Sequence, residues 1–227
     1  MTPSARPDQP VPSWRRRIFI PPLLAIVNRM LAPAQQHRAT QFAEVEAAPG
    51  RVVFLGDSIT EGGLWDEWFP DVAVLNRGIG GERTAGVLSR LDTAIDEPAA
   101  VFLLIGTNDL MGLIPHEEIA RNVAAILDGI EERAPGTPVF VQSVMPRAKS
   151  YREEVQALNR RYVQLVDERP EHIRYVDLWP ALATPESTLD RRFTRDRLHL
   201  NGRGYRAWVK ILEPLVTPFG SPKPEIH

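Results

Sequence analysis

The sequence contains no cysteine. Disulfides, thiolate metal sites, iron–sulfur clusters and a cysteine nucleophile are therefore excluded. A strong excess of one charge is also missing, because 27 basic residues face 29 acidic ones and the net charge is -2. Such a balance does not favour phosphate backbones, so we expect no nucleic-acid partner. With 43% hydrophobic and 25% charged residues over 227 positions, the composition is that of a soluble globular protein.

Long hydrophobic runs are missing as well. The apolar run at residues 18–27 is interrupted by Pro21 and Pro22, and at about ten residues it is shorter than the roughly 20 that span a bilayer. We therefore expect no integral membrane span and a cytoplasmic protein. The alternative is an exported or peripherally membrane-associated protein, anchored through residues 13–34.

The two ends of the chain differ from its middle. Eight of the 21 prolines lie in the first fifty residues, and prolines recur from Pro214 onward, where they argue against a continuing helix. We therefore expect an N-terminal arm (1–50), a central domain (51–216) and an extended or disordered Pro-rich tail (217–227). The apolar residues of the arm are expected to pack on the body of the domain or on a neighbouring subunit, which would make the protein a homo-oligomer.

Between these ends, apolar runs of strand length alternate with longer segments of helical period. Strand candidates lie at 52–55, 72–75, 101–105, 139–141 and 173–176, and amphipathic helices at 84–95, 117–133, 152–168 and 204–212. Strands this apolar are covered on both faces, so the alternation predicts an α/β fold with a parallel sheet between helix layers. Such a fold carries its functional groups in the loops after the carboxyl ends of the strands.

The first predicted strand ends in Gly56-Asp57-Ser58. Gly56 permits a sharp turn, and Ser58 then lies where a helix would begin, with unpaired backbone N–H groups beside its hydroxyl. A nucleophile placed there has an oxyanion site nearby. The alternative is that Asp57 or Ser58 only caps the helix.

A serine nucleophile needs a base, and the chain has five histidines. Four of them lie in the arm, at a helix start, before the fifth strand or at the last residue. His199 lies just before the last predicted helix, three residues after Asp196. A carboxylate that close can accept a hydrogen bond from the imidazole and stabilise its charged form. The alternative is a surface loop with a turn-forming aspartate and a partly buried histidine.

Two further loops supply neutral hydrogen-bond donors. The third strand ends in Gly106-Thr107-Asn108-Asp109, where the Asn108 amide suits an oxyanion. A glycine-rich loop at 78–81 follows the second strand and lets backbone N–H groups approach a substrate. Each loop is an ordinary turn sequence on its own. Together with the serine and the Asp-x-x-His pair, both fall at the same edge of one predicted sheet.

These four segments jointly resemble the sequence blocks of the SGNH (GDSL) hydrolase family, in the branch similar to platelet-activating-factor acetylhydrolase catalytic subunits and carbohydrate acetylesterases. The resemblance covers roughly residues 51–212. It implies a flavodoxin-like three-layer α/β/α sandwich with a five-stranded, mainly parallel sheet. It also implies a serine esterase that hydrolyses short-chain acyl esters, acetyl esters in particular, through an acyl-serine intermediate.

Carried over residue by residue, the resemblance makes Ser58 the nucleophile, His199 the general base and Asp196 its orienting partner. The Ser58 N–H, the Gly81 N–H and the Asn108 amide would form the oxyanion hole. The partner is then a small-molecule ester, with no cofactor and no metal, since no cluster of metal ligands is apparent. The alternatives are an acyltransferase that uses the same site and a non-catalytic scaffold that binds a ligand without turnover.

The acyl pocket is expected beside the nucleophile. Leu64, Trp65 and Trp68 follow it in the sequence, and Leu110 and Met111 follow the third strand. Two bulky indoles typically close a short pocket, although both could equally be core residues. The candidate substrate-binding residues are Asp57, Trp65, Gly80 and Met111.

Overall fold

The structure is a computed structural model that describes residues 29–30, 32–45 and 49–220. The basic and apolar segments expected at 13–27 lie outside the described residues, as do residues 221–227 of the expected tail. None of the described helices combines the length and the apolar character needed to cross a membrane.

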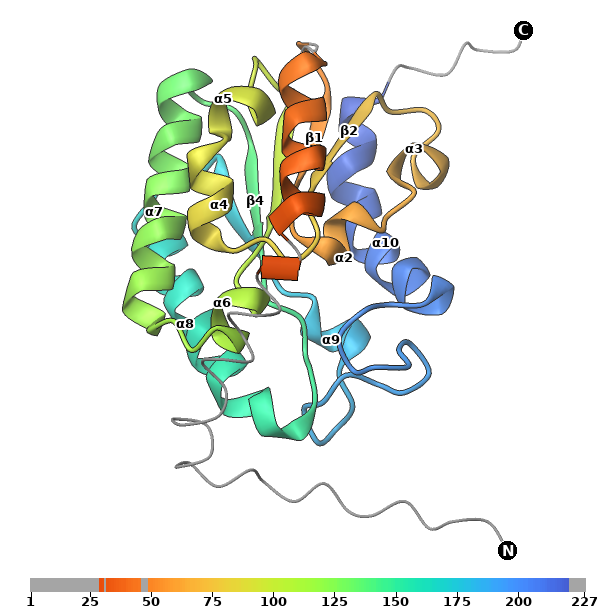
Figure 1. Ribbon diagram of the computed structural model, residues 1–227. Coiled ribbons are helices and arrows are strands. Elements are labelled where there is room, and N and C mark those ends of the chain that lie inside the picture. Colours follow the sequence, from red (N-terminus) through yellow and green to blue (C-terminus); the bar gives the residue numbers. More distant parts are fainter. Residues whose placement is uncertain (1–28, 31, 46–48, 221–227) are drawn as a thin grey trace, which may run out of the picture.

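A five-stranded sheet forms the centre of the molecule (Figure 1), with the order β2-β1-β3-β4-β5 and every neighbouring pair parallel. The strands are β1 (Val52–Gly56), β2 (Val74–Gly78), β3 (Ala100–Leu104), β4 (Val139–Gln142) and β5 (Ile173–Val176). The predicted parallel sheet is confirmed. Because the chain turns to one side of β1 for β2 and to the other for β3, a crevice is expected at the carboxyl ends of β1 and β3.

Residues of the central strands alternate between the two faces of the sheet. Val53, Leu55 and Leu103 belong to one buried cluster, whereas Phe54 and Phe102 belong to another. Alternation with a period of two is the geometry of a strand, and both sets are apolar because both faces are covered.

Helices cover each face and complete the three-layer sandwich that the resemblance implied. The first cluster receives apolar residues from α4 (Thr84–Ser89), α5 (Leu91–Ala94), α7 (His116–Arg133) and α8 (Arg152–Asp167). The second receives them from α3 (Trp65–Trp68), α9 (Trp179–Leu182) and α10 (Gly202–Val216). The short α2 (Ser58–Glu61) and α6 (Thr107–Met111) follow β1 and β3, and 3₁₀ turns lie at Lys149–Tyr151 and Thr217–Phe219.

A helix also precedes the sheet, because residues 29–30 and 32–44 are helical. This N-terminal helix, red in Figure 1, lies beside α4 and α5. Its Phe42 is 7% exposed, and the guanidinium groups of Arg77 and Arg90 lie 4.6 and 5.7 Å from the centre of its ring. The described part of the arm therefore packs on the body of its own chain. A homo-oligomer formed through the arm stays a prediction.

The helix predicted at 84–95 is divided in two. Arg90 leaves helical geometry, with φ -128° and ψ 23°. Its side chain turns inward, where it forms a buried ion pair with Glu82 at 2.5 Å. The break therefore has a side-chain cause that the apolar spacing of this segment does not reveal.

Two other elements differ from the prediction by more than one residue. The second strand begins at Val74 rather than Val72, because the Val72 N–H still donates to Phe69 in the turn that follows α3. Helix α10 runs past Pro214 to Val216, although the proline removes a backbone donor. Packing explains this continuation, since Val216 is fully buried against the second cluster.

Candidate active site

The predicted site residues meet where β1 and β3 end. Asp57 and Ser58 follow β1 directly, and Asn108 lies in the first turn of α6 after β3. His199 comes from the loop before α10, 141 positions away from Ser58 in the sequence, yet the two side chains touch. The groups therefore converge on the crevice that the strand order predicts.

A continuous chain of hydrogen bonds joins the predicted nucleophile, Ser58, through His199 to its predicted orienting partner, Asp196. Ser58 Oγ lies 3.0 Å from His199 Nε2, and His199 Nδ1 lies 2.7 Å from Asp196 Oδ2. Both distances lie within ordinary hydrogen-bond range. In this arrangement the imidazole can accept the serine proton at one nitrogen while the carboxylate holds the proton on the other.

The loop that carries His199 is fixed by its own bonds. Thr194 and Leu200 form an antiparallel bridge that closes it. Inside the loop, Asp196 Oδ1 accepts hydrogen bonds from the Thr194 hydroxyl and from the N–H groups of Leu198 and His199. Burial works against the charge of Asp196, but the hydrogen bonds from His199 and Leu198 outweigh it and lower the pKa of this carboxyl. Asp196 is therefore held as an anion in register with the imidazole.

Asp57 is buried beneath the nucleophile, with 1% of its surface exposed. Its Oδ1 accepts the Ile59 N–H at 2.9 Å, so it caps α2, as the alternative interpretation of this motif holds. Burial raises the pKa of Asp57 to about 7, although the Ile59 N–H and the nearby His199 act in the opposite direction. A carboxyl on the residue before the nucleophile thus titrates near neutral pH.

Asn108 is tied to the loops on both sides of it. One amide contact is a 2.9 Å bond from Nδ2 to the Glu82 carbonyl, and the other is a 3.4 Å contact from Nδ2 to Asp57 Oδ2. A hydrogen bond as long as the 3.4 Å contact with Asp57 is weak. That N–H can therefore be given up to a substrate oxygen while the first bond keeps the amide in place.

The next residue, Asp109, fastens the same loop to α4. Its carboxylate accepts the Thr84 N–H at 3.1 Å and the Thr84 hydroxyl at 2.6 Å. Burial raises the pKa of Asp109 despite these bonds from Thr84. The loops after β2 and β3 are thus joined by buried polar contacts rather than by apolar packing alone.

Two glycines of the site have backbone conformations that residues with side chains rarely adopt. Gly81 has a φ of 73° and Gly106 a φ of 120°. At Gly106 a side chain would also collide with the Tyr162 hydroxyl, 2.6 Å from the position of an added Cβ. An added Cβ on Gly80 would lie 2.9 Å from Glu61 Oε2 and 3.9 Å from Ser58 Cβ. The glycine loop therefore passes directly beside the nucleophile.

The side chains that were expected to line the acyl pocket occupy different environments. Trp65 is 1% exposed, stacks on Phe54 at 4.0 Å and donates its indole N–H to the Thr60 carbonyl. It is a core residue, and the expectation that it contacts the substrate is not supported. The reason is its place in α3, whose inner face covers the sheet. Leu110 is also buried in the core, at 6% exposure.

The remaining candidates are closer to solvent. Leu64 is 57% exposed, Met111 is half-buried at the end of α6, and Trp68 is half-buried under the Arg206 guanidinium, which lies 5.7 Å from its ring. The roles of Met111, Gly80 and Asp57 in substrate binding stay predictions.

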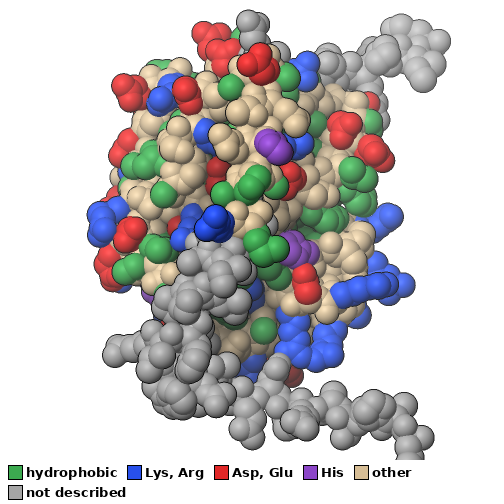
Figure 2. Space-filling view, viewed as in Figure 1, with side chains coloured by type: hydrophobic (Ala, Val, Ile, Leu, Met, Phe, Trp, Pro, Cys, Tyr) green, Lys and Arg blue, Asp and Glu red, His purple; other side chains and the backbone are tan. Residues whose placement is uncertain are grey.

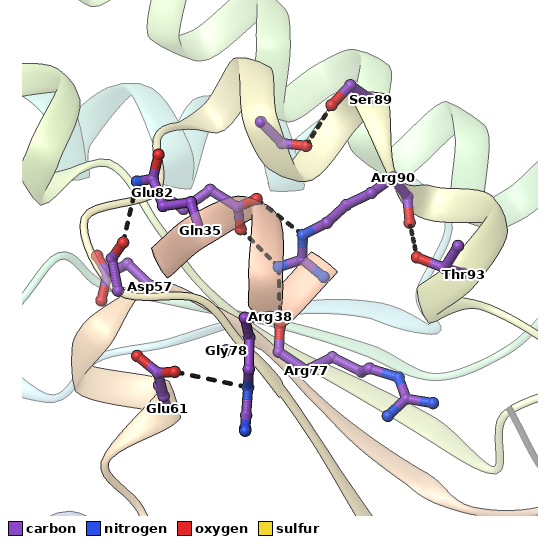
Figure 3. A network of polar contacts seen from close by, with 12 residues as sticks. Gln35, Arg38, Asp57, Glu61, Arg77, Gly78, Glu82, Ser89, Arg90 and Thr93 are labelled. Carbon is purple, nitrogen blue, oxygen red and sulfur yellow. Dashed lines mark hydrogen bonds and ion pairs between the residues drawn. The ribbon is translucent and has the colours of Figure 1, made fainter. Parts of the chain in front are cut away.

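Several residues that support the site were missed in the sequence. Arg147 is 8% exposed and donates to the Thr107 hydroxyl at 3.1 Å, and burial lowers the pKa of its guanidinium. Glu82 and Arg90 form the buried pair shown in Figure 3. Tyr205 donates its hydroxyl to the Ile59 carbonyl at 2.7 Å. No local pattern draws attention to them, because each looks like an ordinary surface residue in the sequence.

Basic side chains surround the loop that carries the histidine. Figure 2 shows Lys and Arg side chains gathered on one side of the molecule, over the loop that precedes α10. Those that are exposed include Arg191, Arg192, Arg195, Arg203 and Arg206. A cleft of about 460 Å³ lies among Trp68, Arg192, Asn201 and Arg206. In the described ranges no group of three or more potential metal ligands is present.

Comparisons with known proteins identify the family of this chain. The model of the GDSL-like lipase/acylhydrolase family matches residues 54–207. The platelet-activating factor acetylhydrolase IB subunit alpha1 of Bos taurus is 32% identical over 175 residues, which cover 73% of this chain and 74% of that protein.

Solved structures give the same result for the fold. A Streptococcus pneumonia protein named for platelet activating factor has a TM-score of 0.79 at 27% identity, with 86% of this chain and 98% of that chain covered. The acetyl xylan esterase AlAXEase has a TM-score of 0.62 at 19% identity, with 73% and 99% covered, which shows a shared fold. The predicted fold class and resemblance are both confirmed.

Proposed function

Because the chain belongs to the GDSL-like lipase/acylhydrolase family, we propose that it is a serine esterase that hydrolyses short-chain acyl esters, acetyl esters in particular. The family makes it a carboxylic ester hydrolase. The mechanism rests on one observation, the line of hydrogen bonds from Ser58 through His199 to Asp196, with distances of 3.0 and 2.7 Å.

In the first step, Ser58 Oγ attacks the ester carbonyl carbon while His199 Nε2 takes the hydroxyl proton. The imidazole becomes positively charged, and the Asp196 carboxylate beside Nδ1 stabilises that charge. The tetrahedral intermediate then collapses. The bond to the alcohol oxygen breaks, His199 returns the proton to the leaving alcohol, and an acyl-serine remains.

The oxyanion of the intermediate is held by the Ser58 N–H, the Gly81 N–H and the Asn108 amide. Ser58 begins α2, and Gly80, the neighbour of Gly81, lies beside Ser58, so both backbone donors belong to segments next to the nucleophile. Asn108 contributes the N–H that makes only the 3.4 Å contact with Asp57. Donors fixed before the reaction lower its barrier because they need no rearrangement when the charge forms.

Deacylation repeats the same chemistry with water. His199 removes a proton from a water molecule, whose oxygen attacks the acyl carbon of the intermediate. A second tetrahedral intermediate forms in the same oxyanion hole. Its collapse breaks the bond to Ser58 Oγ, which recovers its proton from His199 and releases the carboxylic acid.

Acetyl is the preferred acyl group because the buried residues beneath Ser58 are polar. Asp57, Asp109 and Arg147 are each no more than 8% exposed, and Trp65, which was expected to offer apolar surface, faces the core. A long acyl chain needs apolar walls that these residues do not give. The relative from Bos taurus, an acetylhydrolase subunit by name, supports the same substrate class.

A fluorophosphonate probe and a set of aryl esters test the proposal. The wild-type chain should be labelled at one serine, and Ser58→Ala should abolish both labelling and turnover. Ser89→Ala is the matched control, since Ser89 is an exposed serine on α4 whose hydroxyl binds only its own helix. The value of kcat/KM should peak at acetyl to butyryl esters and fall steeply by octanoyl. Labelling that persists in Ser58→Ala would refute the mechanism, and an octanoyl optimum would refute the substrate class.

A further inference from the structure

The N-terminal helix reaches the oxyanion loop, although it lies outside the region that matches the family. The side chain of Gln35 donates a hydrogen bond from Nε2 to the backbone carbonyl of Gly80, at 2.9 Å. This contact joins two segments 45 positions apart. It is made to the loop that supplies a proposed oxyanion donor.

The bonded carbonyl belongs to the peptide unit that carries that donor. The Gly80 C=O and the Gly81 N–H are the two ends of one planar peptide group, so an orientation imposed on the oxygen also orients the N–H. Glycine lies on both sides of this group, and Gly81 has a φ of 73°. With no Cβ on either side, rotation of this peptide meets little steric resistance. An external hydrogen bond is therefore the means by which its direction can be fixed.

The position of the helix is itself well secured. Arg38 pairs with Glu61 of α2 at 3.5 Å, as Figure 3 shows. One turn further along, Phe42 is buried against Arg77 and Arg90. Gln35 thus extends from a helix that is anchored on two later turns, and its amide is held at the carbonyl rather than free in solvent.

The ion pair between Arg38 and Glu61 also changes the charge beside the oxyanion loop. The Glu61 carboxylate lies against Gly80, 2.9 Å from the position of an added Cβ. A negative charge there opposes the negative charge that forms on the substrate oxygen. Arg38 partly neutralises it. The N-terminal helix therefore contributes both an orientation and a favourable charge to the same loop.

We propose that Gln35 is a positioning residue of the oxyanion hole, which holds the Gly80–Gly81 peptide so that the Gly81 N–H faces the reacting carbonyl. The inference rests on the proposed esterase function. A donor bound to the peptide oxygen also polarises the group and strengthens the N–H at its other end. Gln35 does not touch the substrate, so its effect is expected only where charge develops, in the transition state.

The test compares three variants of the full-length chain. Gln35→Ala removes the donor, and Gln35→Glu keeps the shape of the side chain while replacing the N–H donor by oxygen. Gln36→Ala is the matched control, because Gln36 is the next residue of the same helix and is exposed. Loss of one oxyanion donor costs about 10²- to 10³-fold, and misorientation of one should cost less. We expect both Gln35 variants to lose about tenfold in kcat with KM nearly unchanged, and Gln36→Ala to match the wild type.

A second readout separates positioning from loss of packing. A trifluoromethyl ketone that forms an oxyanion adduct with the serine should bind the Gln35 variants more weakly, by the same factor as their loss in kcat/KM. The inference is overturned if both Gln35 variants keep kcat within twofold of the wild type, or if the loss lies entirely in KM. Failure of the esterase proposal itself looks different, because the wild type would then hydrolyse no ester, or Ser58→Ala would remain active, whatever the residue at position 35.

Discussion

The two sides of the candidate site are built differently. On the oxyanion side, Asp57, Glu82 and Asp109 are between 1% and 8% exposed, and their carboxylates accept hydrogen bonds from Ile59, Arg90 and Thr84 respectively. On the acid–base side, the side chains of His199 and Asp196 are 49% and 53% exposed and depend on bonds within one short loop. Substitutions on the first side should therefore affect folding and activity together, whereas substitutions on the second should affect activity alone.

The largest effect is expected on the exposed side. His199→Ala should lower kcat/KM by about 10⁴-fold or more, because the nucleophile loses its base. The free energy of unfolding should change by no more than about 0.5 kcal/mol, as for other exposed positions. Ester hydrolysis and urea unfolding measure the two quantities. His172→Ala, whose histidine pairs with Glu131 away from the site, serves as the control.

A double variant sharpens this prediction. If the two side chains act in one step, the combination of Ser58→Ala with His199→Ala should be little worse than either alone. Losses that multiply would mean that they serve different steps. The contrast between the buried oxyanion side and the exposed acid–base side would be wrong if His199→Ala proved strongly destabilising.

The second effect concerns the contribution of the buried Trp65 to the stability of the fold. Trp65→Ala should lower the free energy of unfolding by about 3–5 kcal/mol, because it leaves a large cavity against Phe54 and Trp208. The folded fraction should keep the acyl-chain preference of the wild type. Thermal unfolding and kcat/KM on acetyl to octanoyl esters test both parts. A shift of the optimum to longer chains would return Trp65 to the acyl pocket.

The third prediction tests the oxyanion side directly. Asn108→Ala should cost about 10²- to 10³-fold in kcat with a smaller change in KM. It should also lower the free energy of unfolding by about 1–3 kcal/mol, because the partly buried Glu82 carbonyl loses its donor. Asn122→Ala is the control, since its amide bonds Thr84 in the same network. That variant should lose stability while kcat stays within a few-fold of the wild type.

The fourth prediction follows from the titration of Asp57. Its pKa is raised from 3.8 to about 7 by burial, so the folded state binds a proton more tightly than the unfolded state between these values. The stability contributed by this group is therefore present at low pH and is lost as the pH rises from about 4 to 7. Asp57→Asn should remove that dependence, which amounts to a few kcal/mol at most.

Urea unfolding at pH 5 and pH 8 measures this effect. The wild type should lose more stability between the two values than Asp57→Asn does, and the exposed control Asp96→Asn should behave like the wild type. Equal losses in Asp57→Asn and the wild type would mean that Asp57 is already ionised at pH 5.

The smallest effect concerns the alcohol half of the substrate. Because exposed arginines surround the loop of His199, an acetyl ester with an anionic alcohol should react a few-fold faster at low salt than one with a cationic alcohol. Salt near 0.5 M should abolish the difference, since it screens exposed charges. A ratio that does not respond to salt would exclude this electrostatic cause.

The strands, the main helices and the sheet edge that carries the site could be predicted from sequence, because they depend on local periodicity and on short motifs. Ser58, Asp196, His199 and Asn108 follow from the same motifs. The structure brings all four together.

Other features depend on contacts between distant segments, which no local pattern records. The break of the helix at Arg90 accompanies burial of its side chain, which pairs with Glu82 and lies against the ring of Phe42 from the N-terminal helix. The inward orientation of Trp65 depends on Trp208, which arrives from the last helix. Gln35 is one polar residue of an amphipathic helix until the fold places the glycine loop beside it.

The order of the chain has a consequence for how activity is acquired. Asp196 and His199 lie three residues apart, so their geometry forms locally, while the nucleophile belongs to the first strand–helix turn. The histidine and the serine meet only when α10 docks. The hydrogen bond from the Tyr205 hydroxyl to the Ile59 carbonyl fixes that helix beside Ser58. A nascent chain thus carries a serine without its base until nearly the whole domain has been synthesised. Hydrolysis is therefore a late event in folding, and its recovery reports the docking of the last helix.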